Sequence, residues 1–156
     1  MSESADNKMD FQSRVQPWMQ DCFGAVIAGD QAERNHRFLE EALELVQSCN
    51  CTQHEAHQLV DYVFGRPVGE PTQEVGGVMV TLAALCLAHG MDMHANGETE
   101  LARIWTKVEQ IRAKQAAKPR YGPLPEVVLN KDGSVTYSCA PDHVNHGSAI
   151  HVAYRR

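Results

Sequence analysis

Several features that would assign this sequence to a class of protein are missing. Its five cysteines are an odd number without paired spacing, so we expect no disulfide framework and a reducing, cytoplasmic environment. No segment has the form of a signal peptide, and the longest apolar run, residues 76–88, is too short to span a bilayer. Internal repeats and low-complexity tracts are absent as well. These absences favour a cytoplasmic globular protein with no membrane partner.

Positive charge is scarce. The 156 residues include 14 Lys and Arg against 20 Asp and Glu, which gives a net charge of −6. Nonspecific nucleic-acid binding depends on cationic side chains that neutralise phosphates, so this balance argues against a nucleic-acid partner. A small anionic ligand stays compatible with it, provided that a metal ion and a few local cations offset the acids.

Helical periodicity dominates most of the chain. Apolar residues recur at i, i+3 and i+4 spacing, and the breaks between them carry Gly, Pro or capping residues. This pattern predicts an all-α fold, a five-helix chain that forms an oligomeric helical bundle. The predicted helices are residues 11–28, 31–49, 52–64, 71–89 and 96–118.

The chain ends and the helical part form three predicted regions. Residues 1–10 are polar and are expected to be a disordered leader, residues 11–118 form the all-α domain, and residues 119–156 form a C-terminal tail. Within the tail, residues 127–137 alternate as a short β-hairpin that turns at Asp132-Gly133.

Three carboxylates gather in the second predicted helix. Glu41 and Glu44 share one helical face, as do Glu40 and Glu44. Like charges one turn apart destabilise an isolated helix by roughly 0.2–0.5 kcal/mol per pair. A solvated helix face accounts for such a run without any function. A hard divalent cation such as Mg²⁺, which usually accompanies phosphate substrates, accounts for it equally well.

The fourth predicted helix is apolar on every side and is therefore expected to be buried. Glu74 lies in its first turn, where burial of a carboxylate is costly unless a positive charge lies beside it. Burial of this helix needs more apolar surface than four other short helices supply, which favours a second chain. The acids of the second and fourth helices are thus expected to share one site.

These acids carry a resemblance to a known family. The run EEALEL at residues 40–45, with Glu74 opening an apolar helix and a basic helix after it, resembles the MazG-like all-α nucleoside triphosphate pyrophosphohydrolases. The resemblance covers roughly residues 35–118. Members of that family are homo-oligomeric helical bundles that hold Mg²⁺ on a triphosphate with an E-x-x-E and a later E-x-x-D motif. Water attacks between the α- and β-phosphates, which gives a nucleoside monophosphate and pyrophosphate.

The resemblance implies roles for individual carboxylates. Glu41 and Glu44 match the first motif and Glu74 matches the first acid of the second, so these three would bind Mg²⁺, or Mn²⁺ in its place. Glu40 and Glu41 are the catalytic candidates, since a carboxylate left free of the metal would activate the attacking water.

One position departs from the family pattern. Gly77 stands where the family has its Asp, which removes one expected metal ligand. Glu70, one turn before Glu74, would compensate if the fourth helix begins early enough. The pair Gly76-Gly77 has two readings: close approach of a nucleotide to bare backbone, or tight helix–helix packing at an oligomer interface.

Three cations are the candidates for binding phosphate oxygens. Lys107 and Lys114 lie along the predicted fifth helix, in line with Arg103, and Arg37 lies one turn before Glu41. The resemblance implies that such cations contact the triphosphate, whereas a solvated helix face explains them without a ligand.

Three interpretations stay open. The first is a Mg²⁺-dependent nucleoside triphosphate pyrophosphohydrolase that works as a homodimer or homotetramer. The second is a nucleotide-binding sensor or sequestering protein on the same scaffold, which binds without hydrolysis and which Gly77 favours. The third is a structural helical oligomer whose acids only decorate its surface. Periodicity does not identify the residues that contact the base or the sugar, so it does not predict which nucleotide the protein prefers.

Overall fold

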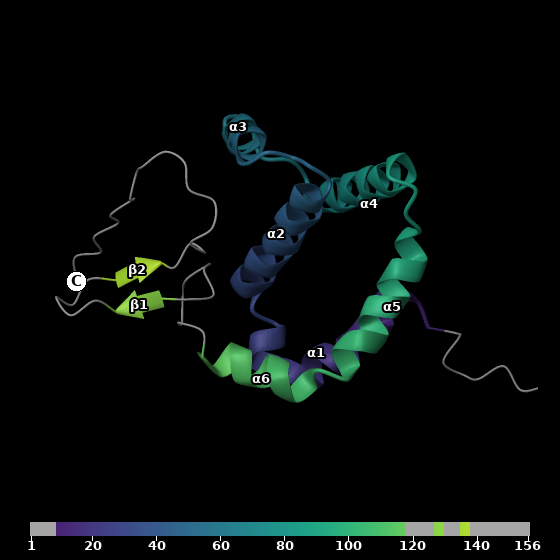
Figure 1. Cartoon of the computed structure of the whole chain (residues 1–156), viewed down its shortest axis with the longest axis vertical. Coiled ribbons are helices and arrows are strands. Elements are labelled where there is room, and N and C mark those ends of the chain that lie inside the picture. The colour runs from purple at the N-terminus through teal and green to yellow at the C-terminus, as the bar shows by residue number, and fades with distance from the viewer. Residues whose placement is uncertain (1–8, 118–126, 130–134, 138–156) are drawn as a thin grey trace, which may run out of the picture. The chain divides into compact units, whose positions relative to one another are not determined.

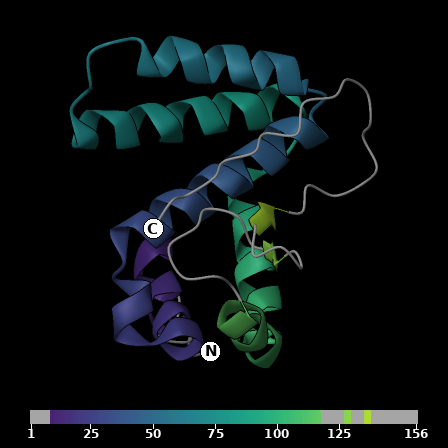
Figure 2. The same ribbon diagram turned by 90° about the vertical axis from the view of Figure 1, so that its left-hand side faces the viewer.

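The computed structural model describes residues 9–117, 127–129 and 135–137. This part of the chain is dominated by helices (Figure 1), and Figure 2 shows them from the side. In chain order they are α1 (Phe11–Ala28), α2 (Gln31–Ser48), α3 (Gln53–Phe64), α4 (Pro71–Ala88), α5 (Met93–Trp105) and α6 (Val108–Ala117). The chain divides into two compact units, Met1–Val108 and Glu109–Arg156. The predicted all-α character is confirmed for the described residues, whereas the domain boundary at residue 118 stays a prediction.

Local capping explains where α2, α3 and α4 begin. Asp30 accepts a hydrogen bond from the amide of Glu33 at 3.1 Å, and Thr52 forms the predicted capping box with Glu55. Pro71 occupies the first turn of α4, where an N–H would have no intrahelical partner in any case. The first four predicted helices are confirmed to within a residue at each end.

The predicted fifth helix is wrong at its start and in its length. It begins before Asn96, because Asp92 caps it by accepting a hydrogen bond from the amide of Ala95 at 2.9 Å. It is also two helices, since the backbone tightens at Thr106 and Lys107, whose amides bond to carbonyls three residues back. The apolar spacing continues across this break, which is why the sequence pattern did not reveal it.

Helix α1 is bent at Gly24. This residue has φ 69° and ψ 167°, a conformation that only glycine adopts at little cost, so the predicted continuous helix is interrupted there. Asp10 caps the start of α1 by accepting a hydrogen bond from the amide of Ser13 at 2.9 Å. Asp10 therefore belongs to the helix rather than to the predicted leader, of which residues 1–8 lie outside the described part.

The C-terminal part is described at two short strands. Strands β1 (Val127–Leu129) and β2 (Val135–Tyr137) pair antiparallel, with Val128 opposite Thr136. The predicted turn at Asp132-Gly133 lies outside the described residues, so the hairpin as a whole stays a prediction.

Few apolar side chains are enclosed in the described residues. Cys22 in α1, Cys86 in α4 and Leu101 in α5 are buried. Helices α4 and α5 meet at the short link of residues 89–92 that joins them. Helices α1 and α5 are joined by Arg14, whose guanidinium donates to both carboxylate oxygens of Glu98 at 2.7 and 2.6 Å. These contacts position α5, whose acidic and basic residues enter the candidate site.

Among the described residues, helix α4 is largely uncovered. The prediction that it is buried on all sides is wrong there, because Cys86 is its one buried residue and Val80 and Leu87 are 70% and 81% exposed. By length and composition alone, α4 is the one described helix that could cross a membrane, a test that a soluble core helix passes equally well. The apolar stripe of α2 is uncovered too, with Phe38 and Leu39 more than half exposed.

Candidate functional site

The charged side of α2 is covered unevenly, because Arg37 and Glu40 are half-buried whereas Glu41 and Glu44 are exposed. Arg37 is 19% exposed in its side chain and forms ion pairs with Glu40 and with Glu33, the latter at 3.4 Å between Nε and Oε1. Glu40, the candidate base, is therefore held by Arg37 one turn earlier on the same helix. This arrangement places a cation beside the acids, as the sequence predicted for Arg37.

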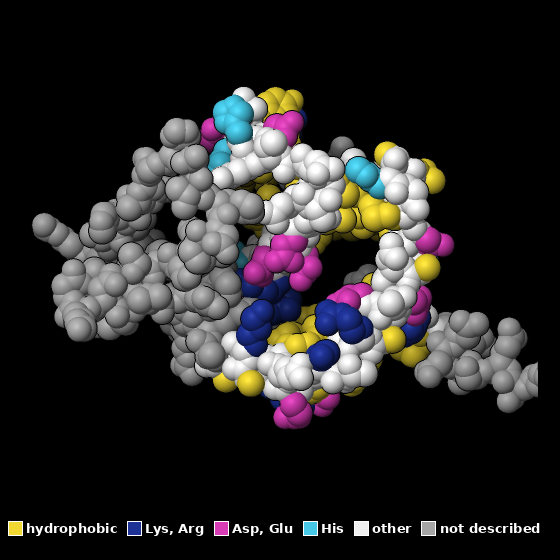
Figure 3. Space-filling model, viewed as in Figure 1, with side chains coloured by type: hydrophobic (Ala, Val, Ile, Leu, Met, Phe, Trp, Pro, Cys, Tyr) yellow, Lys and Arg dark blue, Asp and Glu magenta, His cyan; other side chains and the backbone are white. Residues whose placement is uncertain are grey.

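Glu41 lies among other carboxylates. Partial burial raises the pKa of Glu41, and repulsion from Glu44, Glu40 and Glu100 raises it further, whereas Arg103 acts in the opposite direction. Glu100 and Arg103 belong to α5, so two helices contribute to the surroundings of this one carboxylate. Figure 3 shows acidic and basic side chains gathered over α2, with a second basic group over α5.

Glu100 and Arg103 form a two-pronged ion pair on α5. The Nε and Nη2 atoms of Arg103 donate to the carboxylate of Glu100 at 2.7 and 2.6 Å. This pairing lowers the pKa of Glu100 and raises that of Arg103. Arg103 was predicted only as part of the basic line, and Glu100 was not predicted as a site residue, although their i, i+3 spacing indicates a pair. Only the packing of α5 brings them within electrostatic reach of Glu41.

Glu74 lies in the first turn of α4, as predicted, with its carboxylate folded back against Gly69. A Cβ on Gly69 would overlap that carboxylate, which is the flexible end of an exposed side chain and can move aside. Glu70 caps α4 by accepting hydrogen bonds from the amides of Thr72 and Gln73, at 2.9 and 3.1 Å. Glu70 therefore lies before the helix and is engaged in its cap, which speaks against its replacing the missing Asp.

The predicted metal ligands do not all meet in one chain. Glu41 and Glu44 lie together on α2, but Glu74 is absent from the groups that act on the pKa of Glu41. Among the described residues, no three His, Cys, Asp or Glu side chains are grouped so that they could hold a metal ion. A single chain thus supplies a pair of adjacent carboxylates rather than a full ligand set.

The predicted line of cations is divided. Lys107 is half-buried at the break after α5, and Lys114 is exposed in α6, which belongs largely to the second unit. The prediction that both lysines extend along one helix is therefore wrong, because α5 and α6 are separate helices. Of the cations on this predicted line, Arg103 is the one that acts on the pKa of Glu41.

A second cation is enclosed near the start of α2. The guanidinium of Arg34 lies over the ring of Phe23 at 5.1 Å and 3.7 Å from Glu33. Trp18 meets Phe23 edge to face, with 5.5 Å between the ring centres. Burial lowers the pKa of Arg34. These contacts join α1 to the start of α2, next to the charged side of α2.

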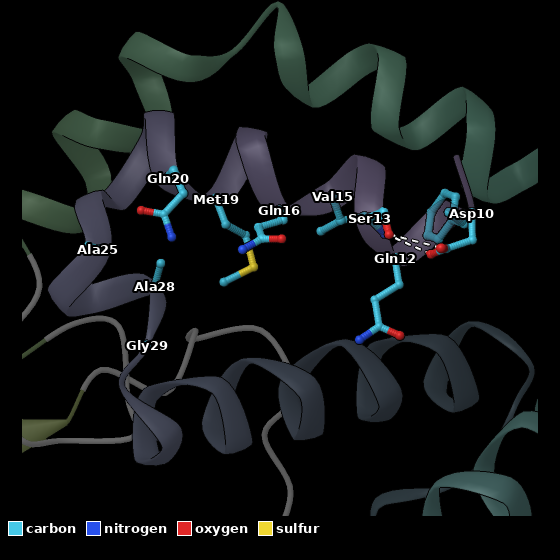
Figure 4. Close-up of a pocket in the computed structure, with 11 residues that line it drawn as sticks. Asp10, Gln12, Ser13, Val15, Gln16, Met19, Gln20, Ala25, Ala28 and Gly29 are labelled. Atoms are coloured by element: carbon cyan, nitrogen blue, oxygen red, sulfur yellow. Dashed lines mark hydrogen bonds between the residues drawn. The ribbon is translucent and has the colours of Figure 1, made fainter. Parts of the chain in front are cut away.

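Two depressions in the described part of the chain are lined by α1 and its ends and contain none of the predicted site residues. One, with a volume of about 840 Å³, is lined by residues from Asp10 to Gly29, all from α1 and its ends (Figure 4). Its polar lining is mainly glutamine and the capping pair Asp10–Ser13, which suits no phosphate ligand. A ligand of the acids would instead lie over the charged side of α2.

Comparisons with known proteins add no family to this picture. Neither a protein-family model, nor a curated protein sequence, nor a solved structure matches the chain.

Proposed function

We propose that this chain is a Mg²⁺-dependent nucleoside triphosphate pyrophosphohydrolase. The observation that carries the proposal is the environment of Glu41, where partial burial and three further carboxylates raise its pKa. Repulsion among these carboxylates does not stabilise the fold, but the same group of negative charges suits a bound cation. The resemblance of the run at 40–45 and of Glu74 to the MazG-like enzymes supplies the substrate class.

The proposed metal ligands are Glu41 and Glu44, which lie one turn apart on α2, together with Glu74. A bound Mg²⁺ supplies Lewis-acid polarisation of the phosphoryl oxygens. Since Glu74 does not join the pair within one chain, the complete set requires either a movement of α4 or a second copy of the chain. The working form in this proposal is accordingly a homodimer or homotetramer in the cytoplasm.

The other side chains have defined tasks in this proposal. Glu40 accepts the proton of the water that attacks the α-phosphorus, and Arg37 holds Glu40 in position. The bond between the α-phosphorus and the oxygen that bridges to the β-phosphorus breaks, so the products are a nucleoside monophosphate and pyrophosphate. Arg37 and Lys107 offset phosphate charge as the substrate binds, and Arg103 takes part from α5.

Product analysis tests the proposal directly. The full chain is incubated with each natural ribo- and deoxyribonucleoside triphosphate in Mg²⁺ and in Mn²⁺, and nucleotides and pyrophosphate are separated by chromatography. We expect the monophosphate and pyrophosphate in equal amounts, and no product in excess chelator. Formation of a diphosphate and inorganic phosphate, or no metal-dependent reaction with any nucleotide, would contradict the proposal.

The second candidate function is nucleotide binding without hydrolysis. Gly77 supports it, because Glu70 is occupied as the cap of α4 and leaves the second motif one acid short. A weakened metal site retains affinity for the phosphates of a nucleotide while its rate of hydrolysis falls. Recovery of intact nucleotide after prolonged tight binding would favour this function over the first.

Replacement of Arg103 by Gln is expected to move the acid limb of the kcat/KM profile to higher pH. Arg103 lowers the pKa of Glu41 and, through its ion pair, that of Glu100. Without Arg103 both carboxylates hold their protons to higher pH, so the ionised form that binds metal is reached later. The measurement is hydrolysis rate against pH at fixed Mg²⁺.

The matched control is Arg112→Gln, since Arg112 forms the same i, i+3 ion pair with Glu109 on α6 at 2.7 Å. This control is expected to retain the wild-type pH profile. Superimposable profiles for the two variants would show that Arg103 does not act on the site.

A further inference from the structure

Two cysteines lie in the short link that joins α2 to α3. The link spans residues 49–52, with Cys49 at its first position and Cys51 at its third. Both thiols are free and half-buried, whereas the free thiols of Cys22 and Cys86 are buried in α1 and α4. A thiol exchanges only with a reagent that can reach it, so Cys49 and Cys51 are the two described thiols open to small molecules.

The backbone of this link forms a Schellman cap at the end of α2. The amide of Cys51 donates to the carbonyl of Val46 at 2.9 Å. The amide of Asn50 donates to the carbonyl of Gln47 at 3.0 Å. Asn50 has φ 68°, the left-handed conformation that such a cap requires and that Asn tolerates better than most residues. The residue between the two thiols is therefore fixed by the cap.

This cap brings the two thiols to the same side of the helix end. The residue after the left-handed one, here Cys51, commonly packs against the residue in the position of Val46. Cys49 also neighbours Val46, because residues three apart lie on one face of a helix. Around a left-handed residue the flanking Cα atoms are about 5.4 Å apart, the mirror image of the right-handed helix. Bonded cysteines have Cα atoms about 4.4–6.8 Å apart, so the backbone spacing suits a disulfide.

A disulfide between Cys49 and Cys51 would be easily reduced. It closes a loop of only three residues, so it removes little chain entropy from the unfolded state and adds little stability. Exposed disulfides of low stability are the labile and regulatory ones, and disulfides in a reducing cytoplasm are usually transient. The pair therefore fits a reversible exchange rather than a structural cross-link.

We propose that Cys49 and Cys51 form a redox switch that exchanges with small-molecule disulfides such as oxidised glutathione. One thiolate attacks a sulfur of the glutathione disulfide and releases one reduced glutathione. The other thiolate attacks the protein sulfur of this mixed disulfide, which forms the Cys49–Cys51 bond and releases a second reduced glutathione. Two electrons pass from the protein to the glutathione disulfide, and the two thiol protons pass to the released glutathione sulfurs.

Oxidation locks the link between two parts of the proposed site. Helix α2 carries Glu41 and Glu44, and α3 leads on to α4, which carries Glu74. A closed ring holds Asn50 in its left-handed conformation and so fixes the direction in which α3 leaves α2. The switch depends on the two thiols and requires no hydrolysis, so it and the proposed function can fail separately.

The test treats the full reduced chain with mixtures of reduced and oxidised glutathione. The remaining thiols are alkylated in denaturant, and cleavage after glutamate without reduction releases residues 45–55, which contain Cys49, Cys51 and no other cysteine. After oxidation we expect this peptide to be two hydrogen atoms lighter by mass spectrometry and to carry no alkyl group. Reduction is expected to restore both alkylation sites, while Cys22 and Cys86 are alkylated throughout.

Amide hydrogen exchange measured by NMR reports whether the bond locks the link. The amides of Asn50 and Cys51 are expected to exchange more slowly in the oxidised chain, because their hydrogen bonds in the cap open less often. Unchanged exchange at both amides would show a bond that switches nothing, and would overturn the inference.

Two kinds of variant are the controls. Cys49→Ser and Cys51→Ser each leave one thiol in the link, so the peptide is expected to carry at most one glutathione. Ser48→Cys combined with Cys49→Ser keeps two thiols but turns one of them about 100° around the helix, away from Val46. This variant is expected to form less disulfide at the same glutathione ratio.

Three results of the mass analysis would overturn the inference. The first is a wild-type peptide that gains only glutathione or stays reduced in excess oxidised glutathione. The second is a bond from Cys49 or Cys51 to Cys139 in place of the bond within the link. The third is equal oxidation of the wild type and the variant with its thiol at position 48, because the cap would then not be what pairs the thiols.

Discussion

Replacing Glu41 with Gln is expected to lower kcat/KM for pyrophosphate release by at least about 100-fold. A bound metal stabilises developing phosphoryl charge by several kcal/mol, and each 1.36 kcal/mol corresponds to about tenfold in rate. Gln keeps the size of the side chain but lacks the charge that binds Mg²⁺. The rate is measured with the best nucleotide substrate over a series of Mg²⁺ concentrations.

The same substitution is expected to stabilise the folded chain near neutral pH. Burial and neighbouring acids raise the pKa of Glu41 above its ordinary value of 4.5, so the folded state binds this proton more tightly than the unfolded state. Stability from this group is therefore present at low pH and is lost as the pH rises through the folded pKa. Removing the charge adds roughly 0.2–0.5 kcal/mol per relieved pair near neutral pH.

Thermal unfolding against pH checks the sign of this effect. The gain in melting temperature of Glu41→Gln over wild type is expected to be largest near neutral pH and to vanish as the pH falls to about 4.5. Glu109→Gln is the control, because Glu109 pairs with Arg112 on α6 and its side chain is 84% exposed.

Hydrolysis that survives Glu41→Gln at the wild-type rate would remove Glu41 from the site.

Gly77→Asp is expected to raise Mg²⁺-dependent hydrolysis by about tenfold or more. The substitution supplies an acid where the MazG-like enzymes that the sequence resembles have their Asp, one turn after the position of Glu74. Gly77 is exposed and a Cβ there meets no atom within 4 Å, so the side chain enters without a clash. Asp is also a better helix former than Gly, so the helix is not weakened. The readouts are kcat and the Mg²⁺ concentration for half-maximal rate.

Gly76→Asp is a closely matched control. Gly76 precedes Gly77 in the same helix, is equally exposed and has the same free space around a Cβ. Its side chain would point about 100° away around the helix axis, so it is expected to leave the rate unchanged. Equal rates for wild type and both variants would refute the correspondence between Gly77 and the family Asp. A wild type without turnover that gains it through Gly77→Asp would identify the native chain as a binding protein.

The ends of the first four helices could be predicted because their signals are local. The Thr52–Glu55 capping box and Pro71 in the first turn of α4 act within one helical turn, so no distant residue is needed to recognise them. The break after α5 was missed for the opposite reason. Leu101, Ile104 and Val108 keep helical spacing across it, and spacing does not report a local tightening of the backbone.

The candidate site was predictable in part. The pairing of Arg37 with the acids follows from positions one turn apart on α2, which the sequence contains. The contribution of Glu100 and Arg103 does not, because it depends on how α5 packs near α2. The cap formed by Glu70 could not be predicted, because it depends on the residue at which α4 begins.

By itself, the sequence determined that this chain is helical and which side chains share each helical face, because periodicity and capping act over a few residues. Only the tertiary structure decided which residues come near one another: α5 brings Glu100 and Arg103 within electrostatic reach of Glu41, while large apolar side chains of α2 and α4 stay exposed. Packing is a balance among distant surfaces, so one helix considered alone cannot show which of its sides will be covered.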